Sequence, residues 1–363
     1  MRGTAVLAIA MAMFGTAAAA AEVPANYPAS YKDLVAAAEK EGRVVIYSNT
    51  EQFAVAPVLA AFEAAYPNIK VDYTEIKSSE LFTRFVSEAS AGALQADIMW
   101  SSSMDLQYKL LTEGYAQTYV SPEKPAIPAW ANYKDQGFGI TFEPAAFIYN
   151  KRLMAEADVP KSHAELAKLL NTKADAYKGK VGTYDIQRSG LGYFLVSQDL
   201  KAGNTIWDIA KGLGASKARF YTATGTMLEK VGSGEHTLAF NVVGSYAVLK
   251  AKTDPGIGVV IPRDYAIVMT RIAFITKDAK RPAAAKVFLD FLLSQRGQDA
   301  IANKALLFSL RGDVEGEATA AKLTRDLGTA MRPVAIDDNL LELLEPQKRL
   351  PFFKKWQAAV EGK

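Results

Sequence analysis

The chain has 363 residues, which is long enough for two domains. Hydrophobic residues make up 50% of it and charged residues 22%, the balance of an ordinary globular protein. It contains no cysteine, which excludes disulfides, thiol catalysis and cysteine-ligated metals. The net charge of +3, without any basic run interleaved with aromatic residues, argues against nucleic-acid binding.

The first 21 residues have the pattern of a secretory signal peptide. Arg2 gives a positive start, an apolar run covers residues 5–14, and the alanines at 18–21 suit cleavage after Ala21. A retained membrane anchor is the alternative, but the run is shorter than the ~20 apolar residues that span a bilayer. We therefore expect a cleaved signal that directs export through the inner membrane.

After the signal, helices and strands alternate in the order of an α/β fold. Val44, Val45 and Ile46 are the β-branched residues of a short strand buried on both faces, as in parallel sheets. Apolar spacing predicts helices over residues 31–40, 54–66, 78–91 and 104–113, and further strands over 69–73 and 96–100.

The same alternation continues to the end of the chain. We expect strands over residues 138–142, 146–150, 180–184, 220–221, 237–241, 256–261 and 267–275, the last as one long apolar strand. We expect helices over 151–157, 160–170, 191–200, 206–213, 227–231, 246–252, 282–293, 295–302, 340–344 and 352–360. His163 and His236 have no neighbour at metal-ligand spacing, and we expect both at the surface.

Small polar side chains gather where strands end and helices begin. Those after the first and third strands are Ser48, Asn49, Thr50, Ser101, Ser102 and Ser103. In open α/β sheets ligands bind outside the carboxyl ends of the strands. Helix starts there offer free N–H groups and a partial positive charge to an anion. The alternative for Ser102 or Ser103 is a simple helix cap.

A third junction carries an arginine. Arg188 and Ser189 lie between the strand 180–184 and the following helix. A guanidinium can bind two oxygens of a carboxylate or phosphate at once, so Arg188 is a candidate ligand contact. The alternative is an ordinary surface salt bridge. Residues 222–226 form another loop rich in hydroxyl groups.

These junctions carry no catalytic set. The chain has no GxSxG elbow, no GxxxxGK[ST] loop and no GxGxxG after a strand. Many small donors without a nucleophile–base pair are typical of a binding site rather than an enzyme. We expect no catalysis and no cofactor, with a secreted hydrolase as the alternative.

Several stretches resemble the periplasmic solute-binding proteins of ABC importers, a family that includes ferric-ion, phosphorylated-sugar and aminophosphonate binders. They are VVIYSNTEQFAVAPVLAAFEAAYPNIKV, ADIMWSSSMDLQYKLLTEGYA, FIYNKRL, AAKVFLDFLLSQRGQDAIA and SLRGDV. The resemblance implies a type II α/β fold with two lobes, each a doubly wound mixed sheet with helices on both faces. The lobes would hold residues 22–143 with 266–320, and 144–265, while the helices of 321–363 pack on them. The chain would cross between lobes near 141–146 and 262–267, and the lobes would close on a solute by hinge motion.

The resemblance also implies cleft residues and partners. By position, the cleft loops fall on Ser48, Asn49, Thr50, Ser101, Ser102, Arg188, Ser189, Ser245 and Tyr246. Ferric-ion members place two adjacent tyrosines where this chain has Ser245 and Tyr246, which argues against iron. The repeated hydroxyl loops and the single arginine at helix starts favour a small organic anion, a phosphate ester or carboxylate, as the leading ligand. Ferric ion bound by Tyr246, with Tyr184 or Tyr265 in support, is the alternative. We expect a periplasmic monomer that delivers its solute to the permease subunits, and a membrane sensor kinase is a further candidate partner.

Overall fold

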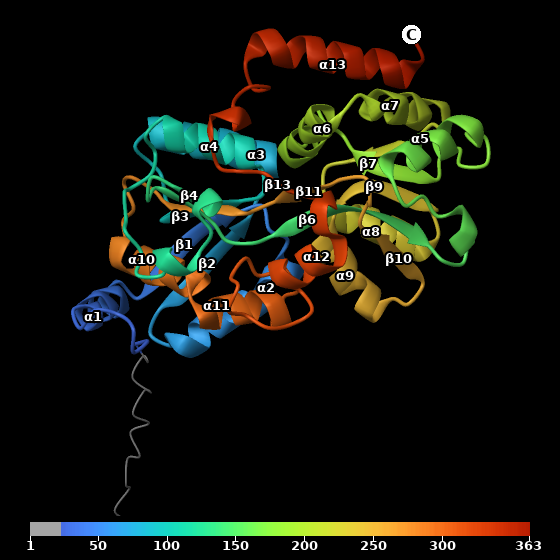
Figure 1. The fold of residues 1–363 in the computed structure, drawn as a ribbon. Coiled ribbons are helices and arrows are strands. Elements are labelled where there is room, and N and C mark those ends of the chain that lie inside the picture. The colour runs from blue at the N-terminus through green and yellow to red at the C-terminus, as the bar shows by residue number, and fades with distance from the viewer. Residues whose placement is uncertain (1–22) are drawn as a thin grey trace, which may run out of the picture.

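The computed structural model describes residues 23–363, so the expected signal peptide, residues 1–21, lies outside the described part. Within 23–363, no helix combines the length and the apolar character needed to cross a membrane. Two mixed β-sheets, each covered by helices on both faces, form two lobes side by side (Figure 1). The two-lobed α/β fold expected from the sequence is confirmed.

The first lobe is built on a six-stranded sheet. Its order is β2 (Lys70–Glu75), β1 (Arg43–Ser48), β3 (Ile98–Ser101), β12 (Ile272–Ile275), β5 (Gly137–Gly139) and β4 (Asn132–Tyr133). Strand β1 runs parallel to β2 and β3, whereas β12 is antiparallel to β3 and β5. The carboxyl ends of β1, β2 and β3 therefore lie together at one edge.

Helices cover both faces of this sheet. They are α1 (Tyr31–Glu41), α2 (Gln52–Ala65), α3 (Ser78–Ser90), α4 (Met104–Thr112), α10 (Pro282–Leu293) and α11 (Gln295–Asp299), which continues as a π-helix (Ala300–Lys304). On one face Phe62 of α2 packs against Phe288 of α10, with ring centroids 4.9 Å apart. On the other, Phe85 of α3 packs against Phe274 of β12 at 6.1 Å. Short 3₁₀ turns cover Lys124–Ala126 and Ala129–Ala131.

The second lobe is built on a seven-stranded sheet. Its order is β13 (Met331–Pro333), β11 (Ala266–Met269), β6 (Glu143–Asn150), β9 (Leu238–Val243), β7 (Val181–Tyr184) and β8 (Arg219–Tyr221), with β10 (Ile257–Val260) also paired to β6. Its helices are α5 (His163–Thr172), α6 (Gly190–Ala202), α7 (Thr205–Ala215), α8 (Thr224–Ser233) and α9 (Gly244–Thr253). Because β7 is parallel to β8 and β9, their carboxyl ends also share one edge.

The connections between the lobes differ from the sequence-based expectation. The predicted single strand 267–275 is two strands, β11 in the second sheet and β12 in the first, separated by Thr270 and Arg271. This crossing pairs with the other one, residues 140–142, through Ile140 N–H to Arg271 O at 2.9 Å. The second crossing thus lies at 270–271 and not at 262–267, and β11 belongs to the second sheet although residues from 266 were expected in the first lobe.

Two smaller expectations are also wrong. Residues 151–157 do not form a helix, since Asn150 Oδ1 accepts the N–H of Arg152 at 2.9 Å in an Asx turn, and only a 3₁₀ turn follows at Glu156–Asp158. The strand expected over 146–150 also starts earlier than predicted, because β6 begins at Glu143.

The two histidines, expected at the surface, are both buried. His163 Nδ1 pairs with Asp264 Oδ1 at 3.1 Å, and its ring stacks on Tyr265 with centroids 3.8 Å apart. His236 Nε2 lies 2.6 Å from the Tyr221 hydroxyl. These tertiary partners offset part of the cost of burying the two imidazoles, although the buried Nδ1 of His236 has no hydrogen-bond partner among the described residues.

The C-terminal segment touches both lobes. Helix α12 (Ala320–Leu327) leads through a 3₁₀ turn (Gly328–Ala330) to β13, and a second turn (Asp338–Leu340) leads to α13 (Pro346–Glu361). Tyr108 of α4 donates to Asp338 Oδ1 at 2.6 Å on the side of the first lobe. Helix α13 packs along α7 on the second lobe (Figure 1).

Candidate functional site

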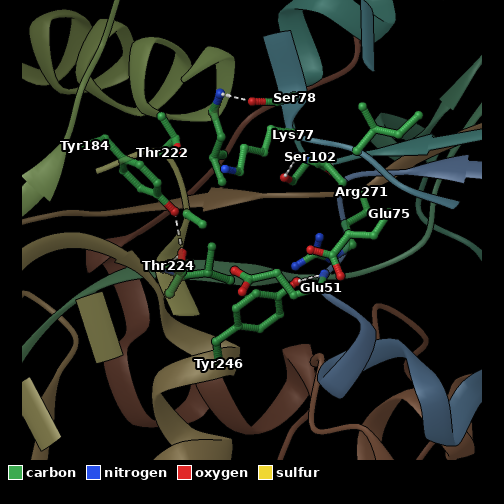
Figure 2. Close-up of a pocket in the computed structure, with 15 residues that line it drawn as sticks. Glu51, Glu75, Lys77, Ser78, Ser102, Tyr184, Thr222, Thr224, Tyr246 and Arg271 are labelled. Atoms are coloured by element: carbon green, nitrogen blue, oxygen red, sulfur yellow. Dashed lines mark hydrogen bonds between the residues drawn. The ribbon is translucent and has the colours of Figure 1, made fainter. Parts of the chain in front are cut away.

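A cavity lies between the lobes, at the strand ends of both sheets (Figure 2). The first lobe contributes the loops after β1, β2 and β3, and the second contributes the end of β7 and the loops after β8 and β9. The residues that line it are Asn49, Glu51, Glu75, Ile76, Lys77, Ser78, Ser102, Tyr184, Leu191, Thr222, Ala223, Thr224, Val243, Tyr246 and Arg271.

Hydrogen bonds join the two lobes around this cavity. The backbone N–H of Glu51 donates to the hydroxyl of Tyr246 at 2.9 Å, and Glu51 Oε1 accepts from Gly225 N–H at 3.0 Å. On another side, Ser78 Oγ accepts from Leu191 N–H at 3.1 Å. The structure therefore has its lobes in contact, and the cavity between them measures about 40 Å³. Because a water molecule needs at least ~10–15 Å³ on this measure, a larger solute can enter only when the lobes separate.

Arg271 lines the cavity from the segment that crosses between the lobes, residues 270–271. Its guanidinium is 1% exposed and donates to both carboxylate oxygens of Glu143, at 2.6 and 3.1 Å. Nη1 donates to Thr50 Oγ1 at 3.0 Å, and the guanidinium lies over the Tyr246 ring at 5.2 Å from its centroid. Arg271 thus joins residues of both lobes to the hinge.

The sequence-predicted residues divide into three groups. Asn49, Ser102 and Tyr246 line the cavity, as does Tyr184. Asn49 and Ser102 also bind each other, through Nδ2 to Oγ at 2.9 Å and N–H to Oδ1 at 3.0 Å. They present an amide and a hydroxyl from two neighbouring strand ends.

The second group is buried behind the cavity. Ser48 Oγ donates to Thr50 Oγ1 at 3.1 Å, and Thr50 in turn accepts from Arg271. Ser101 Oγ accepts from Ser103 N–H at 3.2 Å, and Ser245 Oγ donates to Glu143. These side chains hold the loops and the ion pair in place without lining the cavity.

The third group lies elsewhere. Arg188 is exposed and does not line the cavity. Ser189 Oγ accepts from Gly192 N–H at 3.1 Å and caps α6. Tyr265, the other suggested tyrosine, stacks on His163 inside the second lobe. The arginine that reaches the cavity is Arg271.

The matches to known proteins agree with this architecture. The family model of bacterial extracellular solute-binding proteins matches residues 57–323. The chain belongs to this family. A substrate-binding protein of an ABC transporter from Agrobacterium tumefaciens is 34% identical, with 88% of this chain and 94% of that one covered and a TM-score of 0.84.

More distant structures share the fold of this solute-binding protein. The fructose-6-phosphate-bound periplasmic binding protein AfuA from Actinobacillus pleuropneumoniae is 21% identical, covering 88% of this chain and 99% of that one, with a TM-score of 0.72. Iron-bound HitA from Pseudomonas aeruginosa is 17% identical over 87% and 99%, with a TM-score of 0.66. At these identities the likeness concerns the fold.

Burial shapes the protonation of the cleft of this solute-binding protein. Desolvation raises the pKa of the Tyr184 and Tyr246 phenols well above the ordinary value, although Arg271 opposes the shift at both. Desolvation also raises the pKa of the Glu51 carboxyl, and the negative charge of Glu75 adds to the increase, while the Gly225 N–H lowers it. The phenols are therefore neutral hydrogen-bonding groups at physiological pH.

Sequence reasoning missed several lining residues. Glu51 follows the recognised Ser48–Thr50 loop directly, and Thr222 and Thr224 lie in the hydroxyl-rich loop noted at 222–226. Glu75 ends β2 and Lys77 lies in the β2–α3 loop, which carries no cluster of hydroxyl groups before Ser78. Arg271 had one signal, because it is the only charged residue in the apolar stretch 266–276.

Proposed function

We propose that the protein is the periplasmic solute-binding component of an ABC importer, and that it captures a small organic anion, a phosphate ester or carboxylate, for delivery to a membrane permease. The observation that carries this proposal is the cavity itself. Hydroxyl, amide and ammonium groups from both lobes converge there, and its lining residues include no nucleophile–base pair.

The donors of the cavity suit an oxyanion. Asn49, Ser102 and Thr222 offer polar side chains, and Lys77 offers an ammonium group. Helices α3 and α8 begin at Ser78 and Thr224 on the cavity wall, where the first N–H groups and the helix dipole favour negative charge, although the Gly225 N–H of α8 already donates to Glu51. These groups come from opposite lobes, so an anion between them would favour closure.

Thermal unfolding with a panel of candidate solutes tests the proposal. The panel contains ethyl phosphate, 2-aminoethyl phosphate, butyrate, 4-aminobutyrate and ferric citrate. A solute at 100 times its Kd adds about 2.7 kcal/mol to the free energy of unfolding, which gives a measurable rise in Tm. We expect at least one oxyanion to raise Tm, and a panel without any such rise would contradict the proposal.

A lysine variant ties the effect to the cavity. Lys77→Ala should weaken binding of the stabilising anion by about tenfold, since it removes a charge-assisted contact of roughly 1.5 kcal/mol. Lys70→Ala is the matched control, because Lys70 is an exposed lysine at the opposite end of β2. Equal loss of affinity in both variants would mean that Lys77 acts only through overall charge.

Ferric ion is the second candidate cargo, because Tyr184, Tyr246 and Glu51 all line the same cavity. Phenolate and carboxylate oxygens are the ligands that a hard cation prefers. Against it, burial holds both phenols protonated, so iron would have to displace two protons in a desolvated site. Iron loading should then produce a visible phenolate charge-transfer colour that Tyr246→Phe removes, and a colourless protein after loading would exclude this candidate.

A further inference from the structure

The charged side chains around the cavity carry a net negative charge, which does not suit a simple anion. Arg271 is neutralised by Glu143, with which it forms a two-point ion pair. The other charged lining residues are Glu51, Glu75 and Lys77, so one negative charge remains in excess. Within residues 23–363, none of these three has an ion-pair partner within 4.0 Å. This excess disfavours a dianionic phosphate ester that carries no positive group of its own.

Glu51 is the least satisfied of these groups. Its side chain is partly buried, and the single hydrogen bond of its carboxylate in the described part of the chain runs from Gly225 N–H to Oε1 at 3.0 Å. Glu75 is exposed by comparison, and its Oε2 accepts the N–H of Gln52 at the start of α2. Buried carboxylates are normally paired with a cation, because desolvation of an unpaired charge is costly. The cavity therefore lacks a positive partner for Glu51.

Within residues 23–363, no basic side chain lies close enough to Glu51 to pair with it. All three guanidinium nitrogens of Arg271, Nε, Nη1 and Nη2, already donate to Glu143 or Thr50. Lys77 enters the cavity from the side opposite Glu51 (Figure 2). The two opposite charges face a common space from different directions, which is the arrangement that would orient a dipolar molecule.

We propose that Glu51 determines ligand specificity by binding a positively charged ammonium group of the solute, so that the solute is a small zwitterion. Its oxyanion end lies toward Lys77, Ser102 and Thr222, and its ammonium end lies at Glu51. An ammonium group has three donors, enough for the free carboxylate oxygen and its neighbours. This inference rests on the proposed function, because it describes the solute of the same cavity.

A different role for Glu51 would give the opposite result. If the carboxylate only held the empty lobes together through Gly225, it would compete with a bound anion for the start of α8. Removing its charge would then strengthen binding of plain anions and leave any preference for amines unchanged. The two roles are distinguished by comparing solutes that differ only in the amine.

Isothermal titration with matched pairs provides the test. The pairs are 2-aminoethyl phosphate with ethyl phosphate, and 4-aminobutyrate with butyrate. Losing one member of a desolvated charge pair costs about thirtyfold or more in affinity. We expect an amine-bearing member to bind at least about thirtyfold more tightly than its partner, and Glu51→Gln to abolish most of this difference.

Glu229→Gln is the matched control, since Glu229 is an exposed carboxylate on α8 that influences Glu51 electrostatically but does not line the cavity. It should keep the amine preference. Equal affinity within both pairs, or tighter binding of plain anions to Glu51→Gln with the preference intact, would overturn the inference. In those cases the proposed function stands, whereas it fails only if no member of the panel binds.

Discussion

At the scale of single residues, the Arg271–Glu143 ion pair connects the site to the hinge. Both side chains are almost fully buried, and Thr141, Thr50 and Ser245 complete their hydrogen bonds. Burying two charges costs much of what their attraction returns, so the net contribution of the pair to stability is modest. The main effect of the pair is to position the chain, because it holds the crossing segment against loops of both lobes.

Removing one partner should be far more damaging than removing both. Arg271→Met leaves Glu143 charged and unpaired in the interior, and we expect it to lower the free energy of unfolding by about 3–5 kcal/mol. Urea unfolding followed by tryptophan fluorescence measures this change. The double variant Arg271→Met/Glu143→Leu should recover much of the loss. If the free energy of unfolding of Arg271→Met lay within about 1 kcal/mol of the wild-type value, the ion pair would not be essential to the packing of the buried crossing segment.

The residues that sequence reasoning placed wrongly share one physical cause. Arg188 looked suitable because of its neighbours in the chain, yet the cavity takes its arginine from a crossing whose partner, Glu143, lies 128 positions away. His163 looked like a surface residue because its partner Asp264 lies 101 positions away. Local patterns located the loops of the site well, whereas the charges inside it depend on contacts between distant segments.

At the scale of elements, the same distinction holds. Helices such as α1 and α10 follow the predicted ranges closely, because their apolar spacing is a local property. The division of residues 267–275 into β11 and β12 was not predictable from periodicity, since both halves are equally apolar. Only the pairing of Thr270 and Arg271 with residues 140–141 of the other crossing sets the break.

The start of α6 is one of the places where the second lobe touches the first. A methyl group at Gly190 would lie 2.8 Å from Leu106 Cδ1 and 3.3 Å from the hydroxyls of Ser78 and Ser103, all in the first lobe. We expect Gly190→Ala to hold the lobes slightly apart and to weaken solute binding by about tenfold, the effect of modest overpacking at an interface. Titration calorimetry with the solute that the panel identifies measures this loss.

Gly203→Ala is the control for that variant. Gly203 follows the other end of α6, and an added methyl group there has nothing within 4 Å. Its affinity should match the wild type. If Gly190→Ala also bound normally, the contact between α6 and the first lobe would not be part of the bound state.

At the scale of the whole molecule, the C-terminal segment acts as a strap between lobes that otherwise meet at the crossings and the cleft. Strand β13 pairs with β11, Lys201 Nζ donates to Asn339 O at 2.6 Å, and Phe352 and Trp356 of α13 are buried on the second lobe. On the first lobe the strap is held by Tyr108 to Asp338, and by Ile336 N–H to Trp130 O at 3.2 Å. The attachment of α13 to the second lobe is therefore apolar and extensive, whereas Asp338 is held to the first lobe by a single side-chain hydrogen bond.

This asymmetry predicts that the two ends of the strap affect different properties. Trp356→Ala should lower the free energy of unfolding by about 3 kcal/mol or more, because it leaves a cavity between α13 and α7, while solute affinity stays unchanged.

Tyr108→Phe removes one hydrogen bond worth about 1 kcal/mol in the arrangement with the lobes in contact. If that bond breaks on opening, the population competent to bind falls and affinity drops by about fivefold, with little change in Tm. Calorimetric titration and thermal unfolding of both variants measure the two effects, and a Tyr108→Phe protein with unchanged affinity would mean that the strap moves with the first lobe when the cleft opens.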